Sequence, residues 1–154
     1  FALCKPRRPE LVTVDGDFVR ELFDNALSFS ETDRVIQIER IQRLVKMLAN
    51  QGLVVLVGAL YAHPDLLAWN RANLPGYVEI YIDAPLDLVK QRDPKGLYAQ
   101  VSSGQIKNMV GVDIPWYPPA APDLRIDAAK NESPEHLARV IAARFLGINT
   151  GDQA

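Results

Sequence analysis

The chain contains little cysteine and histidine, two residue types that often bind metals or form cross-links. Its single cysteine, Cys4, excludes an internal disulfide and weakly favours a reducing compartment. The two histidines, His63 and His136, have no second His or Cys at the spacing of a zinc site. The sequence therefore predicts a cytoplasmic protein without a structural zinc site.

Long apolar runs and an excess of positive charge are also absent. The apolar run at residues 53–61 is much shorter than the roughly 20 residues that a membrane helix needs. With 17 basic and 19 acidic residues the net charge is -2, so a basic face for nucleic acid is not expected. We therefore predict a protein that binds neither membrane nor nucleic acid.

Short β-rich runs alternate with segments of helical periodicity. Strands are expected at residues 11–15, 53–61, 77–83 and 124–127. Helices are expected at residues 17–23, 30–50, 64–73, 85–91 and 134–146. This alternation predicts an α/β fold with a mostly parallel sheet, in which the run at 53–61 is buried on both faces.

Several helices have recognisable start signals. Ser30, which is followed by Asp33 three residues on, resembles a capping box, and Ser133 precedes the last expected helix. Asp17 is expected to cap the first helix. His63, before Pro64, is expected to lie in a loop or to cap a helix, and contact with an acceptor phosphate is the alternative.

Residues 92–122 lack periodicity and are rich in Gly, Pro, Lys and Ser. Loops of this length inside a compact domain are usually lids or binding loops, so we predict a lid here. Neither an internal repeat nor a linker interrupts the sequence. We therefore expect residues 1–154 to form a single domain.

The first expected strand ends in two acidic residues separated by a glycine, Asp15-Gly16-Asp17. Ligands of open parallel sheets bind beyond the carboxyl ends of the strands. Two carboxylates at this point can reach a metal-bound phosphate and a substrate hydroxyl together, which is the arrangement that phosphoryl transfer needs. The same residues also fit a turn followed by a helix cap, and the DGD motif alone does not decide between these readings.

Four segments together resemble the adenylylsulfate kinase family, in the order and at the spacing of that family. They are DGDFVR at 15–20, LSFSETDR at 27–34, RDPKGLY at 92–98 and GVDIPWYPP at 111–119. The resemblance extends from about residue 11 to about residue 146. It implies a three-layer P-loop kinase-like fold with a mostly parallel sheet and a lid loop. It also implies ATP and Mg²⁺ as cofactors, phosphoryl transfer to the 3′-hydroxyl of adenylylsulfate, and a homodimer.

The resemblance implies roles for individual residues on the catalytic and acceptor sides. Asp15 and Asp17 would lie beside the acceptor hydroxyl and the magnesium ion, with Asp15 as the metal ligand. Arg20 and Arg34 would bind the anionic group of the acceptor nucleotide, a task that suits planar guanidinium groups.

Further residues would hold the two nucleotides. Phe29 and Met109 would hold the adenine ring of the acceptor. Asp113 would shape the acceptor pocket or cap a turn. Arg92 and Lys95, in the expected lid, would neutralise the ATP phosphates as the lid closes.

The sequence departs from the family pattern at its phosphate-binding loop. No G-x-x-x-x-G-K-[ST] motif occurs in the 154 residues. In this family the motif follows the central strand and precedes the acidic turn. We expect it in a segment upstream of Phe1. A non-catalytic nucleotide-binding domain without a P-loop is the alternative.

A second departure concerns the acceptor. Met109 stands where the family tends to have an aromatic ring, and Glu39 replaces an arginine of an Asn-Ile-Arg-Arg run. Both differences lie on the acceptor side. A related kinase that acts on another nucleotide, such as cytidine diphosphoramidate, is therefore a further alternative.

Overall fold

The computed structural model describes residues 1–93 and 96–148. Strands and helices alternate along these residues, and parallel strand pairs confirm the expected α/β fold. The strands are β1 (Leu11–Asp15), β2 (Val54–Gly58), β3 (Ile80–Asp83) and β4 (Leu124–Asp127). The helices are α1 (Gly16–Leu22), α2 (Glu31–Ala49), α3 (Pro64–Asn73), α4 (Leu86–Gln91), α5 (Leu97–Ser102), the 3₁₀ helix η1 (Ala128–Lys130) and α6 (Pro134–Leu146). Helix α5 was not expected, because it lies within the aperiodic segment 92–122.

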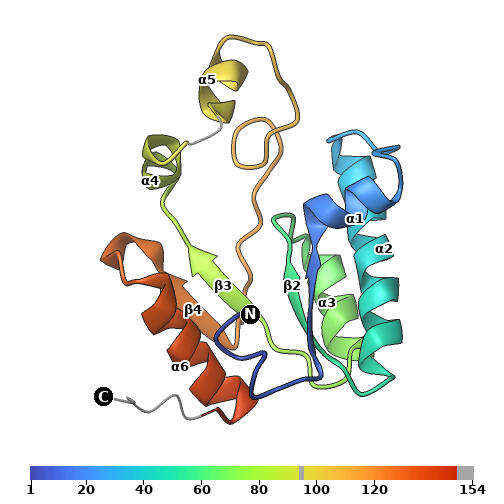
Figure 1. The fold of residues 1–154 in the computed structure, drawn as a ribbon. Coiled ribbons are helices and arrows are strands. Elements are labelled where there is room, and N and C mark those ends of the chain that lie inside the picture. Colours follow the sequence, from blue (N-terminus) through green and yellow to red (C-terminus); the bar gives the residue numbers. More distant parts are fainter. Residues whose placement is uncertain (94–95, 149–154) are drawn as a thin grey trace.

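The strands form two separate parallel pairs. β1 pairs with β2 in a register that joins Leu11 to Val54, and β3 pairs with β4. Helices α2 and α3 lie beside the first pair and α6 lies beside the second, while the lid segment extends past the ends of the strands where α1 begins (Figure 1). The described residues contain no pairing between β2 and β3.

β2 differs from the expectation for residues 53–61. The strand is shorter than predicted, and Val57 is 45% exposed to solvent. The prediction of burial on both faces is therefore wrong for this strand within the described residues. The physical reason is that only β1 pairs with β2 in the described part of the chain, so its other side is not covered by a neighbouring strand.

The main hydrophobic core joins the first strand pair to helices α1–α3. The expected helical spacing is confirmed, because Ile38, Ile41 and Val45 all face this core from α2. Val110 and Ile114, from the lid segment, are buried in the same cluster. A part of the lid segment is therefore packed into the body of the protein.

The start signals of three helices are confirmed by side-chain hydrogen bonds. Ser30 Oγ accepts from the backbone N–H of Asp33 at 3.2 Å, and Ser133 Oγ accepts from that of His136 at 3.1 Å. His63 is the N-cap of α3, since its Nδ1 accepts from the backbone N–H of Asp65 at 3.3 Å. These caps satisfy N–H groups that the first turn of a helix leaves unpaired.

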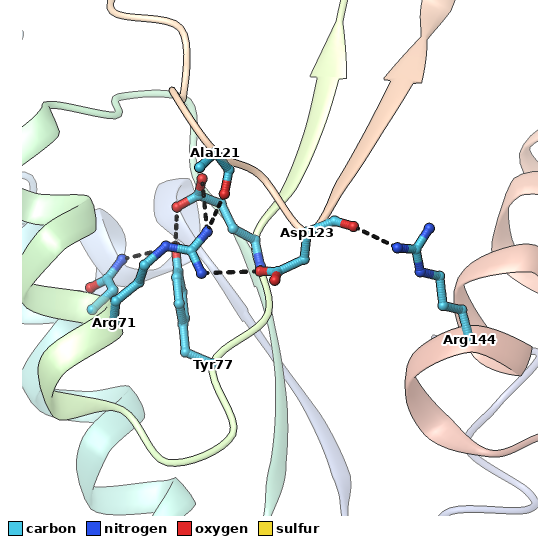
Figure 2. Close-up of polar contacts among 7 residues, drawn as sticks. Arg71, Tyr77, Ala121, Asp123 and Arg144 are labelled. Atoms are coloured by element: carbon cyan, nitrogen blue, oxygen red, sulfur yellow. Dashed lines mark hydrogen bonds and ion pairs between the residues drawn. The ribbon is translucent and has the colours of Figure 1, made fainter.

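Arg71, on α3, lies at the centre of a polar cluster that connects distant segments (Figure 2). Its Nη2 donates to the carbonyl of Ala121 at 2.6 Å and lies 3.4 Å from Glu79 Oε1. Its Nη1 donates to Asp123 Oδ2 at 3.3 Å. Arg144, on α6, donates to the carbonyl of Asp123 at 2.9 Å. The cluster therefore joins α3, the chain leading into β3 and β4, and α6.

Glu79 is the buried member of this cluster, with 7% of its surface exposed. Its Oε2 accepts from the Tyr77 hydroxyl at 3.1 Å, and its backbone N–H donates to Asp123 Oδ2 at 2.8 Å. Burial, reinforced by the nearby Glu79 carboxylate, raises the pKa of Tyr77 to about 12, so Tyr77 remains a neutral donor.

We predict that Arg71→Met lowers the urea midpoint of unfolding more than Arg43→Met does. The first change leaves the Glu79 carboxylate buried without its counter-ion, which is strongly destabilising. The second breaks an exposed pair, Arg43–Glu39 at 3.6 Å, and such pairs contribute little. Circular dichroism during urea unfolding measures both. Adding Glu79→Gln to Arg71→Met should restore part of the loss. Equal midpoints for the two single variants would contradict the prediction.

Candidate functional site

The acidic turn Asp15-Gly16-Asp17 lies where β1 ends and α1 begins. Asp15, and not Asp17 as expected, is the N-cap of α1. Its Oδ1 accepts from the backbone N–H groups of Asp17 at 2.9 Å and Phe18 at 3.3 Å. Asp17 occupies the first helical turn, where a negative charge is favoured by the helix dipole. One oxygen of Asp15 is thus used for the cap, and both carboxylates remain exposed.

A glycine and a buried glutamine position this turn. Gly58, paired with Asp15 in the sheet, lies close to the carboxylate, since a Cβ there would make an ordinary contact of 3.4 Å with Asp15 Oδ2. Gln37, on α2, is 3% exposed, and its Nε2 donates to the carbonyl of Gly16 at 3.1 Å. Its Oε1 is buried and has no hydrogen-bond partner in the described residues. Gln37 was not predicted to belong to the site, because its contact with Gly16 joins residues 21 positions apart.

Arg20, Phe29 and Arg34 lie together at the junction of α1 and α2. Arg20 is 8% exposed, and its Nη1 donates to the carbonyls of Leu27 at 3.2 Å and Ser28 at 3.1 Å. The guanidinium carbons of Arg20 and Arg34 lie 4.5 Å and 5.4 Å from the centroid of the Phe29 ring. The ring itself is 53% exposed. This arrangement offers an aromatic surface beside two cations, which suits a base that carries an anionic group.

The segment that carries Phe29 is held by Asp33, another residue that the sequence did not single out for the site. Asp33 Oδ2 accepts from the backbone N–H of Ser28 at 2.9 Å and also from the Ser28 hydroxyl. These hydrogen bonds lower the pKa of Asp33 below its ordinary value. The partner of Ser30 in the expected capping box therefore closes the preceding turn and fixes the backbone around Phe29.

Residues 108–114, here called the lid turn, contact the same junction. Asp113 Oδ2 accepts from the backbone N–H of Asn108 at 2.6 Å, and Oδ1 accepts from that of Met109. These backbone donors lower the pKa of Asp113. Arg34 Nη2 donates to the carbonyl of Asn108 at 2.9 Å. Asp113 thus closes the turn that carries Met109, and this turn lies against Arg34.

The residues expected on the ATP side are placed apart from this junction. Arg92 follows α4, and its Nη2 donates to Asn131 Oδ1 at 3.0 Å, in the segment after β4. Lys95 lies outside the described residues. Asp93 accepts from the backbone N–H groups of Leu97 and Tyr98, each at 2.9 Å, and so satisfies two N–H groups of the first turn of α5.

A magnesium ion fits this site if it is bound mainly by substrate phosphates, with one or two protein carboxylates as further ligands. No cluster of three or more His, Cys, Asp or Glu side chains suited to a metal occurs among residues 1–93 and 96–148. Mg²⁺ usually binds one or two protein carboxylates together with substrate phosphates. The Asp15 oxygen that is not used by the cap, and the exposed Asp17, meet this requirement.

A membrane-spanning role finds no support in the helices. Within the described ranges, none of them combines the length and the apolar character needed to cross a bilayer. The longest, α2, has 19 residues with charged side chains along it.

The acidic turn at the carboxyl end of β1, with Arg20 on α1 and Arg34 on α2, is typical of α/β proteins that bind nucleotides at this edge of the sheet. The family model described as Adenylylsulphate kinase matches residues 3–127, and the chain belongs to this family. The sequence-based assignment is therefore confirmed.

Individual relatives agree with this assignment. The chain is 38% identical over 130 residues to an Adenylyl-sulfate kinase of Chloroflexus aurantiacus, covering 84% of this chain and 70% of that protein. It is 32% identical to a Probable bifunctional SAT/APS kinase 2 of Sorangium cellulosum, covering 92% of this chain and only 24% of that protein. The solved structure of the Mycobacterium tuberculosis APS kinase CysC in complex with AMPPNP and APS superposes with a TM-score of 0.81 at 29% identity. That match covers 96% of this chain and 88% of that chain.

Asp33 and Asp113, which close the two turns of the site, should make the stability of the fold sensitive to acid. The pKa values of Asp33 and Asp113 are lowered from 3.8 by hydrogen bonds made in the folded state. The unfolded chain therefore takes up protons first as the pH falls. The stabilising contribution is present above pH 3.8 and is lost as the pH falls through the lower folded-state values.

We expect the free energy of unfolding to decline between roughly pH 5 and pH 2, and to decline less in the double variant Asp33→Asn/Asp113→Asn. Urea titrations at a series of pH values measure this slope. The matched control is Asp87→Asn, which changes an exposed aspartate in the first turn of α4. A double variant with the wild-type slope would contradict the prediction.

Proposed function

We propose that this protein transfers the γ-phosphoryl group of ATP to the 3′-hydroxyl of adenylylsulfate, forming 3′-phosphoadenylylsulfate and ADP. The observation that carries the proposal is the exposed Phe29 ring close to the guanidinium groups of Arg20 and Arg34, with Arg20 on the helix that Asp15 caps. Gln37, one helical turn after Arg34, bonds to Gly16 and so connects the acceptor residues with the two aspartates. The membership of the adenylylsulphate kinase family supports the same reaction.

Each residue type suits its proposed role. Phe29 and the lid-turn residue Met109 would hold the adenine ring from two sides, because flat apolar surfaces stack on a base. Arg20 and Arg34 would bind the sulfate and phosphate oxygens through charge-assisted hydrogen bonds. Asp113 would support this pocket by holding Met109 and Asn108 in place.

The two aspartates would divide the work at the reacting atoms. Asp15 gives one oxygen to the helix cap, so we assign its other oxygen to magnesium. The Asp17 side chain does not take part in the helix cap. It would accept the proton of the 3′-hydroxyl as the hydroxyl oxygen forms its bond to the γ-phosphorus. The bond between the γ-phosphorus and the β,γ-bridging oxygen breaks, and ADP leaves. Bound Mg²⁺ supplies charge neutralisation at the phosphates.

On the ATP side, Arg92 and Lys95 would contribute positive charge from the lid segment 92–122. The 154 residues contain no G-x-x-x-x-G-K-[ST] motif, so the assays below use protein expressed from its complete coding sequence. We also propose a single kinase domain over residues 1–154, a cytoplasmic location and a homodimer, following the family resemblance. Light scattering coupled to size-exclusion chromatography tests the last of these.

We predict that Asp17→Asn lowers kcat for adenylylsulfate by at least about 100-fold, because Asn cannot accept the hydroxyl proton. Asp15→Asn should also lower kcat, while α1 stays capped, since Asn is as good an N-cap as Asp. Asp15→Ala is less informative, because it also removes a cap contributing about 1 kcal/mol. The assay measures ADP release with ATP, Mg²⁺ and adenylylsulfate. A kcat of Asp17→Asn equal to that of the wild type would show that Asp17 does not accept the hydroxyl proton.

We predict that Phe29→Leu raises KM for the acceptor by roughly tenfold and leaves KM for ATP unchanged. The change keeps apolar volume and removes the stacking surface, which contributes on the order of 1 kcal/mol or more. Steady-state kinetics with each substrate varied in turn separates the two constants. An equal rise in both KM values would contradict a role of Phe29 that is confined to the acceptor.

A panel of acceptors decides between adenylylsulfate and the alternatives. Met109, in place of an aromatic ring, is the observation that favours a different nucleotide. Preference for cytidine diphosphoramidate over adenylylsulfate would support that alternative. Binding of adenylylsulfate without transfer from ATP would indicate a non-catalytic domain, and transfer to no nucleotide at all would refute the kinase proposal.

A further inference from the structure

Two backbone carbonyls from distant parts of the chain orient the guanidinium group of Arg34. Its Nε donates to the carbonyl of Phe29 at 3.0 Å, and its Nη2 donates to that of Asn108 at 2.9 Å. The first carbonyl belongs to the residue whose ring Arg34 faces, and the second belongs to the lid turn. Nη1 is not used by either of these bonds and can bind an anion.

The carbonyl of Asn108 has a defined direction because of an uncommon backbone conformation. Asn108 has φ 67°, in the left-handed region that most residues avoid and that Asn tolerates better than others. The backbone N–H of the same residue donates to Asp113 Oδ2 at 2.6 Å. A residue that rejects a positive φ would rotate the peptide groups on both sides and turn this carbonyl away from Arg34.

The lid turn that carries Asn108 is firmly seated. Val110 and Ile114 are 8% and 5% exposed and pack into the main core. The carbonyl of Met109 accepts from the N–H groups of Val112, Asp113 and Ile114 at 3.0–3.1 Å. Asn108 therefore presents its carbonyl from a packed support, which a functional side chain needs in order to keep one orientation.

We propose that Asn108 is a positioning residue of the acceptor site, whose left-handed backbone presents the carbonyl that holds Arg34 beside Phe29. The proposal rests on the proposed role of Arg34 as a ligand of the acceptor anion. It assigns no contact between the Asn108 side chain and the substrate. The proposal therefore implies that a substitution at position 108 changes acceptor binding only through its effect on the backbone φ angle.

Two substitutions separate this role from a side-chain role. Asn108→Gly removes the side chain and keeps the positive φ accessible, whereas Asn108→Val opposes it strongly. With adenylylsulfate as the probe, we expect Asn108→Gly to retain the wild-type Kd and KM. We expect Asn108→Val to raise both by roughly tenfold, the effect of losing one charge-assisted hydrogen bond, with KM for ATP unchanged.

A second readout does not depend on the reaction. The NMR signal of the Arg34 Nε–H group, assigned by its loss in Arg34→Lys, should be distinct from solvent-exposed arginines in the wild type and in Asn108→Gly. In Asn108→Val it should move to the position of the exposed arginines. If the valine variant does not fold in urea titrations, Asn108→Ala, which opposes a positive φ less, should give the same changes at smaller size.

The outcomes distinguish the two proposals. A wild-type protein that does not bind adenylylsulfate refutes the proposed function, while the NMR comparison still tests the link between Asn108 and Arg34. A wild-type protein that binds it, together with valine and glycine variants of equal Kd and unchanged Arg34 signals, overturns the positioning role. Loss of acceptor affinity in Asn108→Gly as well would point to the side chain and also overturns it.

Discussion

Arg71 provides the polar contacts that join the two strand pairs in the described residues. β2 and β3 are not paired in the described residues, and no backbone hydrogen bond of these residues joins the two strand pairs in a sheet. Arg71 instead reaches from α3 to the buried Glu79 before β3 and to Ala121 and Asp123 before β4. A cation shared between two carboxylates and a carbonyl holds its partners strongly, because leaving Glu79 unpaired in this buried position is costly.

The same link fixes the lid segment at its return end. Residues 121–123 are held by Arg71, and Val110 and Ile114 are buried in the core. The lid segment is therefore anchored at two places, by packing at Val110 and Ile114 and by polar contacts at residues 121–123. This explains how a long aperiodic stretch supplies a carbonyl to Arg34 in one defined direction.

Much of the candidate site was visible in the sequence because it uses motifs with local causes. DGD places a cap and a free acid at the start of α1, and the SFSETDR segment closes a turn around Phe29. Other features depend on contacts between distant residues and leave no local pattern. Gln37 reaches Gly16 across 21 positions, and Arg34 reaches Asn108 across 74. The exposure of Val57 in β2 was likewise not predictable, since a strand's burial depends on its neighbours and not on its own composition.

The sequence by itself determined the alternation of strands and helices, three of the helix caps and the family, because periodicity, caps and motifs act over a few residues. It did not determine that Asp15 would be the cap and Asp17 the freer carboxylate, because both residues suit either position. Tertiary structure decided the meeting of Arg20, Phe29, Arg34 and the lid turn. The physical reason is that these contacts exist only once α1, α2 and the lid segment pack on a shared core.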